Sequence, residues 1–458
     1  MKALTFTSFL GLACMALELA NLRKVSVPFV LMALTAIFFC NTQEWGANAS
    51  YYHDMLRADN FSIAFTGLLL VIGFALVVLS SAFYKEEESK ISDYLSIIIF
   101  TLCGAIAMVS FANLTLFFIG LEVLSISLYI LAGSKKRDVR SNEAAMKYFL
   151  MGSFASGILL FGIALVYGTT GSFNLADIAN YATTDAPNKL FFIGIVFILI
   201  AMLFKVSALP FHFWAPDVYE GSPTLITAMM ATMAKVAALA AFYRLFSVCF
   251  VAQFSLLTYL LAIVAALTMV VGNLSALNQD SFKRMLAFSG VAHAGYMLLA
   301  ILTLNNNTPN SLFFYATAYS LTSLGAFAIA IAVAKISGSE KIEGFNGFGK
   351  KSPLLAITLT LLMLSMAGIP PMAGFFGKYY VFLDAIRNQH VGVVLVAVLT
   401  SIISIYFYFK VILAMWTKES ADSTTVVTIP FQYQIVAFVA LALVLLLGLM
   451  PGLLAGLI

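Results

Sequence analysis

Apolar segments of about 20 residues follow one another along almost the whole chain, separated by short polar connections. Each segment is long enough, as an α-helix, to cross a hydrocarbon core of about 30 Å. The strict alternation of apolar and polar residues that transmembrane β-strands require is absent from the sequence. The pattern therefore predicts an all-α polytopic membrane protein with about fourteen transmembrane helices, over residues 4–22, 25–42, 60–83, 91–110, 112–131, 142–167, 190–213, 225–250, 254–277, 285–304, 311–335, 353–385, 391–416 and 430–449.

Two of the predicted helices are interrupted by proline and glycine, residues that break a helix. The seventh helix is expected to break at Leu209-Pro210, and the twelfth within the segment Gly368–Gly374. The two breaks are five helices apart, so we expect two five-helix units, helices 4–8 and helices 9–13, related by inversion in the membrane plane. Broken helices at corresponding positions of two inverted units are typical of a transport path.

The connections between the predicted helices are too short to build a soluble domain. The longest of them, at about residues 41–60 and 168–188, are expected to be loops that carry at most a turn of structure. We therefore expect a single membrane domain over residues 1–458. Its parts are helices 1–3 (1–90), the first five-helix unit (91–250), the second five-helix unit (251–418) and helix 14 (419–458).

The amino-acid composition supports a membrane location. Hydrophobic residues make up 62% of the chain and charged residues 10%, with a mean hydropathy of +0.99, so the bilayer is the expected solvent. The four cysteines lie singly and lack the spacing of a zinc or iron–sulfur site. We therefore expect no metal site, no cofactor site and no nucleic-acid partner for this chain.

The distribution of positive charge predicts the orientation of the chain. Most of the 25 lysine and arginine residues fall in connections that follow odd-numbered helices. Because positively charged connections tend to stay in the cytoplasm, both termini are expected on the non-cytoplasmic side. At the edge of the sixth helix, Lys147 follows Glu143 by four residues, a spacing that favours a surface ion pair. The connections on the opposite face hold only Lys2, Arg57, Lys189 and Arg387.

Some charged residues remain within the predicted membrane helices. Glu122 is the acidic residue expected at depth, and a charge near the bilayer centre costs about 3 kcal/mol or more. Such residues must therefore face one another or water. Arg244 is close to a helix end, from which its long side chain is expected to reach water. The basic residues of this group are Lys205, Lys235, Arg244 and Lys378.

Two interpretations of these buried charges are open. A buried lysine gains or loses a proton when a neighbouring charge moves, so Glu122 and the three lysines Lys205, Lys235 and Lys378 together favour a proton path. The alternative is a structural ion pair between Glu122 and Lys205, although one carboxylate cannot neutralise three lysines. His293, about eight residues into the tenth helix, fits either a proton relay or a hydrogen-bonded core residue.

Long stretches of the sequence carry a resemblance to a known family. They are FANLTLFFIGLEVLSISLY in helix 5, KVSALPFHFWAPDVYEGSPT and ATMAKVAALAAFYRLF at helices 7 and 8, FKRMLAFSGVAHAGYMLLAI in helix 10 and MLSMAGIPPMAGFFGKYYVF in helix 12. These stretches, from about residue 59 to residue 416, resemble the antiporter-like, proton-translocating subunits of respiratory complex I (NADH-quinone oxidoreductase). The N-type subunits are the most similar, because M-type subunits have glutamate where this chain has Lys378, and L-type subunits continue beyond helix 14 with a lateral helix.

The resemblance implies a role for each buried residue. Glu122 would pair with Lys205, the lysine of the first proton half-channel. Lys235 would connect this half-channel to His293, which continues the polar axis, and Lys378 would lie at the outlet half.

The resemblance also implies partners and a source of energy. Proton translocation would be driven by electron transfer from NADH to quinone in partner subunits, which would hold the FMN, the iron–sulfur clusters and the quinone. The partners would be other membrane subunits of complex I, in a hetero-oligomer embedded in the lipid bilayer of the bacterial plasma (inner) membrane.

Two rival functions remain open at the level of sequence. The first is a subunit of a multisubunit Na⁺(K⁺)/H⁺ antiporter or of a membrane-bound hydrogenase, which share the fold. The second is a stand-alone transporter of a small solute. A single deep glutamate favours protons over sodium, because sodium would prefer a group of oxygen ligands. The genes or subunits that accompany the chain would distinguish these functions.

Overall fold

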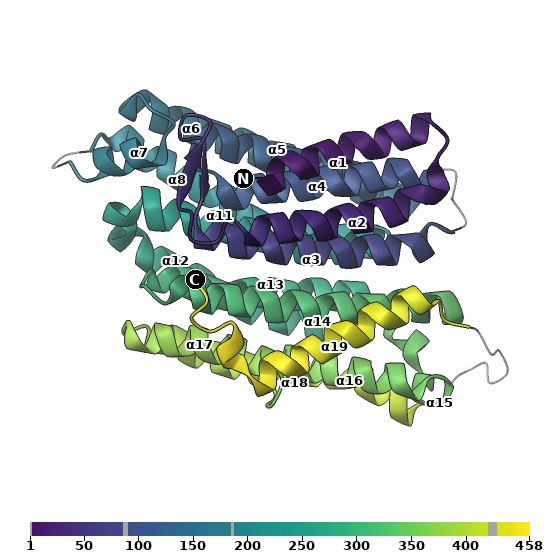
Figure 1. Ribbon diagram of the computed structural model, residues 1–458. Helices are drawn as coiled ribbons and strands as arrows, with labels where there is room; N and C mark the ends of the chain where they lie inside the picture. Colours follow the sequence, from purple (N-terminus) through teal and green to yellow (C-terminus); the bar gives the residue numbers. More distant parts are fainter. Residues whose placement is uncertain (1, 86–89, 185–186, 420–427) are drawn as a thin grey trace.

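The computed structural model describes residues 2–85, 90–184, 187–419 and 428–458, and this part of the chain is almost entirely helical. Long helices lie side by side in one bundle (Figure 1). Twelve helical segments of the described residues are long and apolar enough to cross a membrane. The two remaining predicted spans are each divided by a break, so the prediction of an all-α polytopic membrane protein is confirmed.

The transmembrane segments follow the predicted apolar segments along the whole chain. The helices are α1 (Lys2–Leu19), α2 (Arg23–Thr42), α3 (Asn60–Phe83), α4 (Ile91–Ser110), α5 (Leu114–Ala132), α6 (Val139–Thr170), α7 (Leu175–Ala182), α8 (Lys189–Lys205), α9 (Trp214–Gly221), α10 (Thr224–Met229), α11 (Lys235–Arg244), α12 (Phe254–Leu277), α13 (Phe282–Thr303), α14 (Thr308–Ser337), α15 (Phe348–Lys351), α16 (Pro353–Ala367), α17 (Ala373–Arg387), α18 (Val391–Thr417) and α19 (Phe431–Leu449).

Both predicted helix breaks are present. The chain leaves the helical conformation over residues 206–213, between α8 and α9, and over residues 368–372, between α16 and α17. Each break contains a cis peptide bond before a proline, at Pro210 and at Pro371. The first of these helices ends earlier than predicted, because Ser207 has a φ of +61°, which lies outside the range of a right-handed helix.

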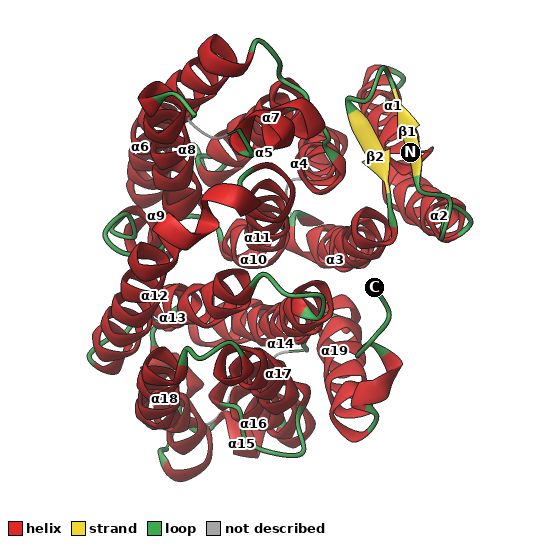
Figure 2. Ribbon diagram, turned by 90° about the vertical axis from the view of Figure 1, so that its left-hand side faces the viewer, coloured by secondary structure: helices red, strands yellow, loops and turns green. Residues whose placement is uncertain are grey.

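The bundle has two halves, which Figure 2 shows in a view along the helices. Helices α4 to α11 gather in one half and α12 to α18 in the other, with α10 and α11 beside α13 and α14 where the halves meet. Each half contains five transmembrane segments, and successive segments alternate in direction. The first segments of the two halves, α4 and α12, therefore run in opposite directions, as inverted units require, while the residue boundaries of the units stay a prediction.

Two connections hold more structure than the sequence predicted. Residues 41–60 contain an antiparallel hairpin of β1 (Ala49–Tyr51) and β2 (Leu56–Ala58), and residues 168–188 contain α7. The expectation of at most a turn in each was therefore wrong, because two short strands pair with each other in the first connection and a helix with one buried apolar face forms in the second. We call the end of the bundle that holds the hairpin and both termini the hairpin end (Figure 1). The opposite end holds the connections rich in lysine and arginine, and we call it the basic end.

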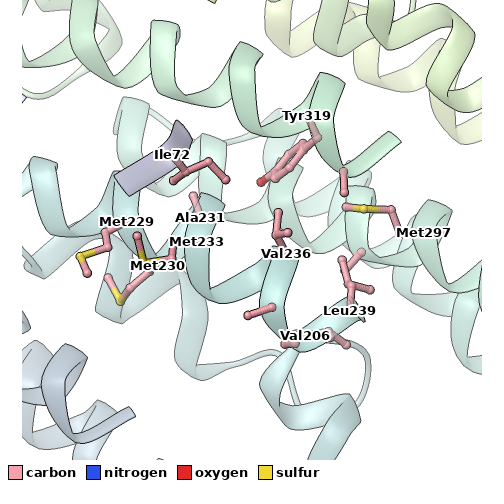
Figure 3. Packing of buried hydrophobic residues seen from close by; sticks show 14 of the residues in the cluster. Ile72, Val206, Met229, Met230, Ala231, Met233, Val236, Leu239, Met297 and Tyr319 are labelled. Atoms are coloured by element: carbon pink, nitrogen blue, oxygen red, sulfur yellow. The ribbon is translucent and has the colours of Figure 1, made fainter. Parts of the chain in front are cut away.

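Close packing holds the core of the bundle together. Helices α4 and α5 approach so closely that a Cβ atom on Gly104 would lie 2.5 Å from the backbone nitrogen of Leu124. Small residues allow this kind of contact between membrane helices, where packing rather than water drives association. Where the two halves meet, methionines fill the space around a π-helical turn at Met230–Ala234 (Figure 3). The flexible methionine side chain suits such an irregular space.

Candidate functional site

The first pair of predicted residues, Glu122 and Lys205, lies where α5 meets the end of α8. The Nζ of Lys205 donates a hydrogen bond of 2.6 Å to the Oγ of Ser125, one helical turn after Glu122. Lys205 and Glu122 interact electrostatically, but these two described side chains form no ion pair within 4 Å. The Oε1 of Glu122 is buried and has no hydrogen-bond partner within the described part of the chain. The direct pair that the resemblance implied is therefore not formed in this conformation, and Ser125 takes its place.

Aromatic rings and a small cavity complete the surroundings of Lys205. Its Nζ lies 5.9 Å from the ring centroid of Tyr129 and 6.0 Å from that of Tyr148, within the range of a cation–π interaction. Lys205 and Lys235 line the same cavity of about 10 Å³. This volume is close to what one water molecule needs. The cavity therefore joins the first two lysines of the predicted path.

Lys235 is the first residue of α11, directly after the π-helical turn, and its side chain is 3% exposed. Its Nζ donates a hydrogen bond of 2.6 Å to the carbonyl oxygen of Gly290 on α13. A Cβ atom on Gly290 would lie 2.7 Å from this Nζ, so the glycine provides the space that the lysine occupies. The Nζ also lies 5.7 Å from the ring centroid of Tyr319 on α14. Single π-helical turns often mark functional positions in helices.

His293 lies on α13 between two lysines of the path. Its Nδ1 is 2.8 Å from the hydroxyl of Tyr315, and its Nε2 is 3.1 Å from the hydroxyl of Tyr408. Both Lys235 and Lys378 are close enough to His293 for electrostatic interaction. The histidine is thus a hydrogen-bonded core residue, as one interpretation required, and it also has the position that a relay between the two lysines would need.

Lys378 lies on α17, shortly after the second break, and is buried. Its Nζ donates a hydrogen bond of 3.0 Å to the carbonyl oxygen of Ala367, the last residue of α16. The Nζ also lies 4.9 Å from the ring centroid of Tyr296 on α13. Lys378 therefore provides a hydrogen-bond donor for a carbonyl oxygen that has lost its helical partner at the break. Inside a membrane such backbone groups must be hydrogen-bonded by the protein itself.

The predicted residues form one row across the bundle. They lie on α5, α8, α11, α13 and α17, which span both halves in the view of Figure 2. Within the described residues, no carboxylate lies at ion-pair distance from Lys235 or Lys378, whose Nζ atoms contact backbone carbonyls instead. The structure thus places all five predicted residues in a common polar row, with an unneutralised lysine in each half.

Sequence reasoning missed the hydroxyl groups that surround this row. They belong to Ser125, Tyr315, Tyr319 and Tyr408, and neutral hydroxyl residues of this kind are common in membrane helices. Their spacing was the available signal, because Tyr315 and Tyr319 are four residues apart and share one face of α14. The sequence also did not single out Asp384, which is 4% exposed but lies close to the end of α17.

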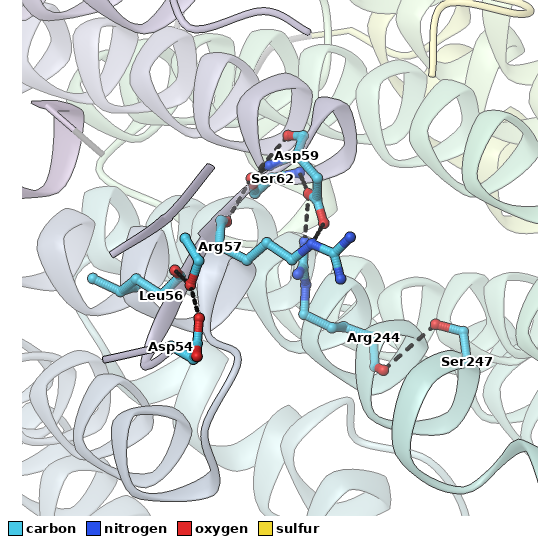
Figure 4. Close-up of polar contacts among 8 residues, drawn as sticks. Asp54, Leu56, Arg57, Asp59, Ser62, Arg244 and Ser247 are labelled. Carbon is cyan, nitrogen blue, oxygen red and sulfur yellow. Dashed lines mark hydrogen bonds and ion pairs between the residues drawn. The ribbon is translucent and has the colours of Figure 1, made fainter. Parts of the chain in front are cut away.

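The expectation for Arg244 was wrong. The side chain does not reach water; it is 4% exposed and forms an ion pair of 2.7 Å with Asp59, the residue that precedes α3 (Figure 4). Arg57 lies 3.9 Å from the same carboxylate. The pair lines a cavity of about 630 Å³ at the hairpin end. A nearby carboxylate therefore outweighed the tendency of arginine to extend to the membrane surface.

At the basic end, an ion cluster joins the two halves. The predicted pair of Lys147 and Glu143 is present at 2.7 Å, and Lys147 also lies 3.2 Å from Asp217 on α9. Arg284 on α13 pairs with Asp217 at 2.7 Å and with Glu220 at 3.0 Å. The surface pair predicted from sequence is thus part of a larger network, which connects α6 and α9 of the first half to α13 of the second.

Comparisons with known proteins give the family of the chain. Residues 112–404 match the family described as NADH:quinone oxidoreductase/Mrp antiporter, TM. The NADH-quinone oxidoreductase subunit N of Flavobacterium psychrophilum is 50% identical, over 99% of this chain and 99% of that protein. The subunit N of Flavobacterium johnsoniae is 44% identical over the full length of both chains.

Solved structures show the same fold. A chain of respiratory complex I from Thermus thermophilus, with bound aureothin, superposes with a TM-score of 0.84 at 33% identity, covering 98% of each chain. A chain of the membrane-bound sulfane sulfur reductase, an archaeal respiratory membrane complex, gives a TM-score of 0.88 at 25% identity, covering 100% of this chain and 96% of that one. The fold is thus shared beyond complex I, but the full-length relatives are more specific. The chain belongs to the family of NADH-quinone oxidoreductase subunit N.

Proposed function

We propose that the chain translocates protons across the membrane as the N-type subunit of an NADH-quinone oxidoreductase. Protons would move along the row of Glu122, Lys205, Lys235, His293 and Lys378. The full-length identity to subunit N proteins supports this assignment over an antiporter or hydrogenase subunit of the same fold.

A row of buried or partly buried lysines on neutral partners supports the proposal most directly. The Nζ atoms of Lys205, Lys235 and Lys378 contact a serine hydroxyl, a glycine carbonyl and an alanine carbonyl. An ion pair would fix the charge of a lysine, whereas a neutral partner holds the amine in either protonation state. A buried charge without a counter-ion is costly, so each lysine responds strongly to a change of charge on its neighbour.

The first step is a movement of Lys205 between two partners. Its Nζ lies on Ser125, one helical turn from the unpaired Oε1 of Glu122. A shift toward Glu122 would form an ion pair and hold the proton on Lys205. A return to Ser125 would remove that counter-ion and release the proton toward Lys235, through the cavity that both lysines line. Water that satisfies the open backbone of residues 206–213 would supply the next proton.

The second half continues the transfer. A charge arriving on Lys235 repels a proton on His293, and His293 in turn lies between Lys235 and Lys378. Neighbouring like charges in a low dielectric repel one another strongly, so we expect protons to leave in sequence along the row. The hydroxyl groups of Tyr315 and Tyr408 hold both ring nitrogens of the histidine in place.

Partners and location follow from the same assignment. We place the chain in the bacterial plasma membrane, within a hetero-oligomer of complex I membrane subunits, with the hairpin end and both termini on the non-cytoplasmic side. Each proton moved against 100 mV costs about 2.3 kcal/mol. Electron transfer from NADH to quinone in partner subunits, which would hold the redox cofactors, would supply this energy.

The test is the substitution Lys205→Ala in native membranes, with NADH-driven quinone reduction and proton pumping followed together. Lys189→Ala is the matched control, because Lys189 is the exposed lysine at the other end of α8. We expect an assembled complex with both rates lowered for Lys205→Ala and unchanged for Lys189→Ala. Unchanged rates in both variants would refute the proton path. Purification of the chain without quinone-reductase subunits would favour the antiporter function.

A further inference from the structure

A second buried carboxylate lies on the same broken helix as Lys378. Asp384 is on α17, six residues after Lys378 and three before the helix ends at Arg387. At 1.5 Å per residue, it is about 9 Å closer to the hairpin end than Lys378. Its side chain is 4% exposed and accepts a hydrogen bond from the Oγ of Ser311. The proposed path of five residues does not use this carboxylate.

A structural role does not account for Asp384. It lies in the last turn of a helix, where the partial negative charge of the backbone disfavours a carboxylate. Within the described residues, no lysine or arginine forms an ion pair with it. Burial of such a group costs free energy that a single serine hydroxyl offsets only in part. A buried carboxylate at an unfavourable position is a candidate for proton transfer.

A polar face of α14 connects Asp384 to His293. Ser311, Tyr315 and Tyr319 are spaced four residues apart and therefore lie on one face of this helix. The hydroxyl of Tyr315 contacts the Nδ1 of His293 at 2.8 Å, and the hydroxyl of Ser311 contacts Asp384. The backbone positions of Ser311 and Tyr315 are one turn of α14 apart, about 6 Å of rise. The proposed transfer needs water between the two hydroxyl contacts.

We propose that Asp384 is the terminal proton acceptor of a branch that leaves the path at His293, before Lys378, and carries protons toward the hairpin end. Ser311 is its positioning residue, because its hydroxyl orients the carboxylate. This inference rests on the proposed function and adds an outlet to it. The location fits an outlet, since Ser311 lies in the first turn of α14 and Asp384 in the last turn of α17, both at the hairpin end.

The transfer balances without any further reactant. Protonated His293 gives the proton on Nδ1 to the oxygen of Tyr315, while the hydroxyl of Tyr315 gives its own proton to the bridging water. The water passes a proton to the carboxylate of Asp384, which becomes a carboxylic acid. The acid then releases this proton to water at the hairpin end. His293 is left neutral, and Tyr315 and Asp384 return to their starting forms.

The test compares Asp384→Asn with Asp384→Glu in native membranes. Asparagine keeps an oxygen that can accept the hydrogen bond of Ser311 but cannot take up a proton, whereas glutamate can. We expect Asp384→Asn to assemble and to lower quinone reduction and proton pumping by about tenfold or more. We expect Asp384→Glu to recover most of both rates. Asp177→Asn is the matched control, because exposed Asp177 on α7 accepts a similar hydrogen bond from Ser172, and its rates should not change.

Several results would contradict the role of Asp384 as a proton acceptor. Wild-type rates in Asp384→Asn would show that no proton needs this carboxylate. Equal losses in Asp384→Asn and Asp384→Glu, or failure of Asp384→Asn to assemble, would show that shape and packing alone matter there. The variant Lys205→Ala distinguishes a failure of this proposal from a failure of the proposed function. If Lys205→Ala loses quinone reduction and proton pumping while Asp384→Asn keeps both, only the role of Asp384 is refuted. If both variants keep both rates, the proton path itself is refuted.

Discussion

At the scale of single residues, the buried lysines are held by weak and neutral partners. Lys205 contacts a serine hydroxyl, while Lys235 and Lys378 contact backbone carbonyls. A hydrogen bond of this kind contributes about 1 kcal/mol net, much less than the cost of moving a charge into a membrane. The amines are therefore free to exchange partners, and small changes in those partners should change the rate of transfer.

Ser125 provides a test of this argument. Ser125→Ala removes the acceptor of Lys205 and leaves every charge in place. We expect Lys205 to favour Glu122 by about 1 kcal/mol, and quinone reduction to fall by about fivefold. Steady-state turnover in native membranes measures the effect. Ser127→Ala, at a buried serine on the same helix, should leave turnover unchanged, and an equal loss in both variants would argue against the role of Ser125.

Asp59 gives a prediction about pH, since it precedes α3 and lies outside the transmembrane segments. Burial raises the pKa of this carboxyl, but the charge and hydrogen bond of Arg244 and the hydrogen bonds of Ser62 outweigh burial and hold the pKa below its ordinary value of 3.8. The charged form therefore stabilises the fold above that value, and the contribution is lost as pH falls through the lower folded pKa.

We expect Asp59→Asn to lower the thermal unfolding midpoint of the purified complex at pH 7. The difference from wild type should stay constant down to about pH 5 and then shrink toward pH 3, because the carboxyl of the unfolded chain binds a proton near its ordinary pKa of 3.8 while the folded one still resists protonation. Differential scanning fluorimetry over this pH range measures it. A difference that is the same at pH 7 and at pH 3 would contradict the ion pair of Asp59 with Arg244.

Charge at depth made Glu122 and the lysines of the polar row predictable from sequence, whereas the neutral hydroxyls beside them were not. Glu122 and the three lysines stand out because a charge inside a bilayer is costly and needs a reason. Ser125 and Tyr315 carry no such cost, so only the fold reveals which of the many serines and tyrosines touch the row. Asp384 was missed because a residue near a helix end resembles a surface residue in sequence, whereas the neighbouring α14 buries it.

At the scale of elements, the broken helices are the features that place the lysines. Lys205 ends α8 at the first break, and Lys378 bonds the last carbonyl of α16 across the second break. Apolar length and proline predicted both breaks and all fourteen spans. The hairpin was not predictable, because it depends on backbone pairing within a short polar connection. Helix α7 was missed although its buried residues Leu175, Ile178 and Ala182 have the spacing of one helix face.

The second break should be sensitive to added volume. A Cβ atom on Gly374, at the start of α17, would lie 1.9 Å from the carbonyl oxygen of Ser365 on α16. A backbone carbonyl cannot move away as a flexible side chain can, so the added methyl group of Gly374→Ala should force α16 and α17 apart. We expect a loss of assembled complex on native gels, or a clearly lower unfolding temperature.

Gly157 on α6 is the control for this substitution, since a Cβ atom there would have no neighbour within 4 Å. Gly157→Ala should keep full assembly, because alanine favours the helix over glycine by about 1 kcal/mol. Wild-type assembly and stability in Gly374→Ala would show that the contact between α16 and α17 is looser than the structure indicates.

At the scale of the whole molecule, the polar row and the ion cluster both cross from one half to the other. Lys235 and Gly290 join the halves within the bundle, and Arg284 with Asp217 joins them at the basic end. Energy from a distant redox reaction can reach this subunit only through contacts that differ between two states. Lys205 provides such a contact, because its proposed partners are Ser125 and Glu122.

We expect protons to cross from the first half to the second through Lys235. The measurement is the number of protons pumped per quinone reduced, in sealed vesicles, for the complex with Lys235→Met. Methionine has a similar length and removes a costly buried charge, so assembly and stability should be kept or improved. Lys351→Met, at an exposed lysine of α15, is the control. We predict that Lys235→Met loses proton pumping and slows quinone reduction, while Lys351→Met matches the wild type. Wild-type pumping and turnover in an assembled Lys235→Met complex would contradict the account.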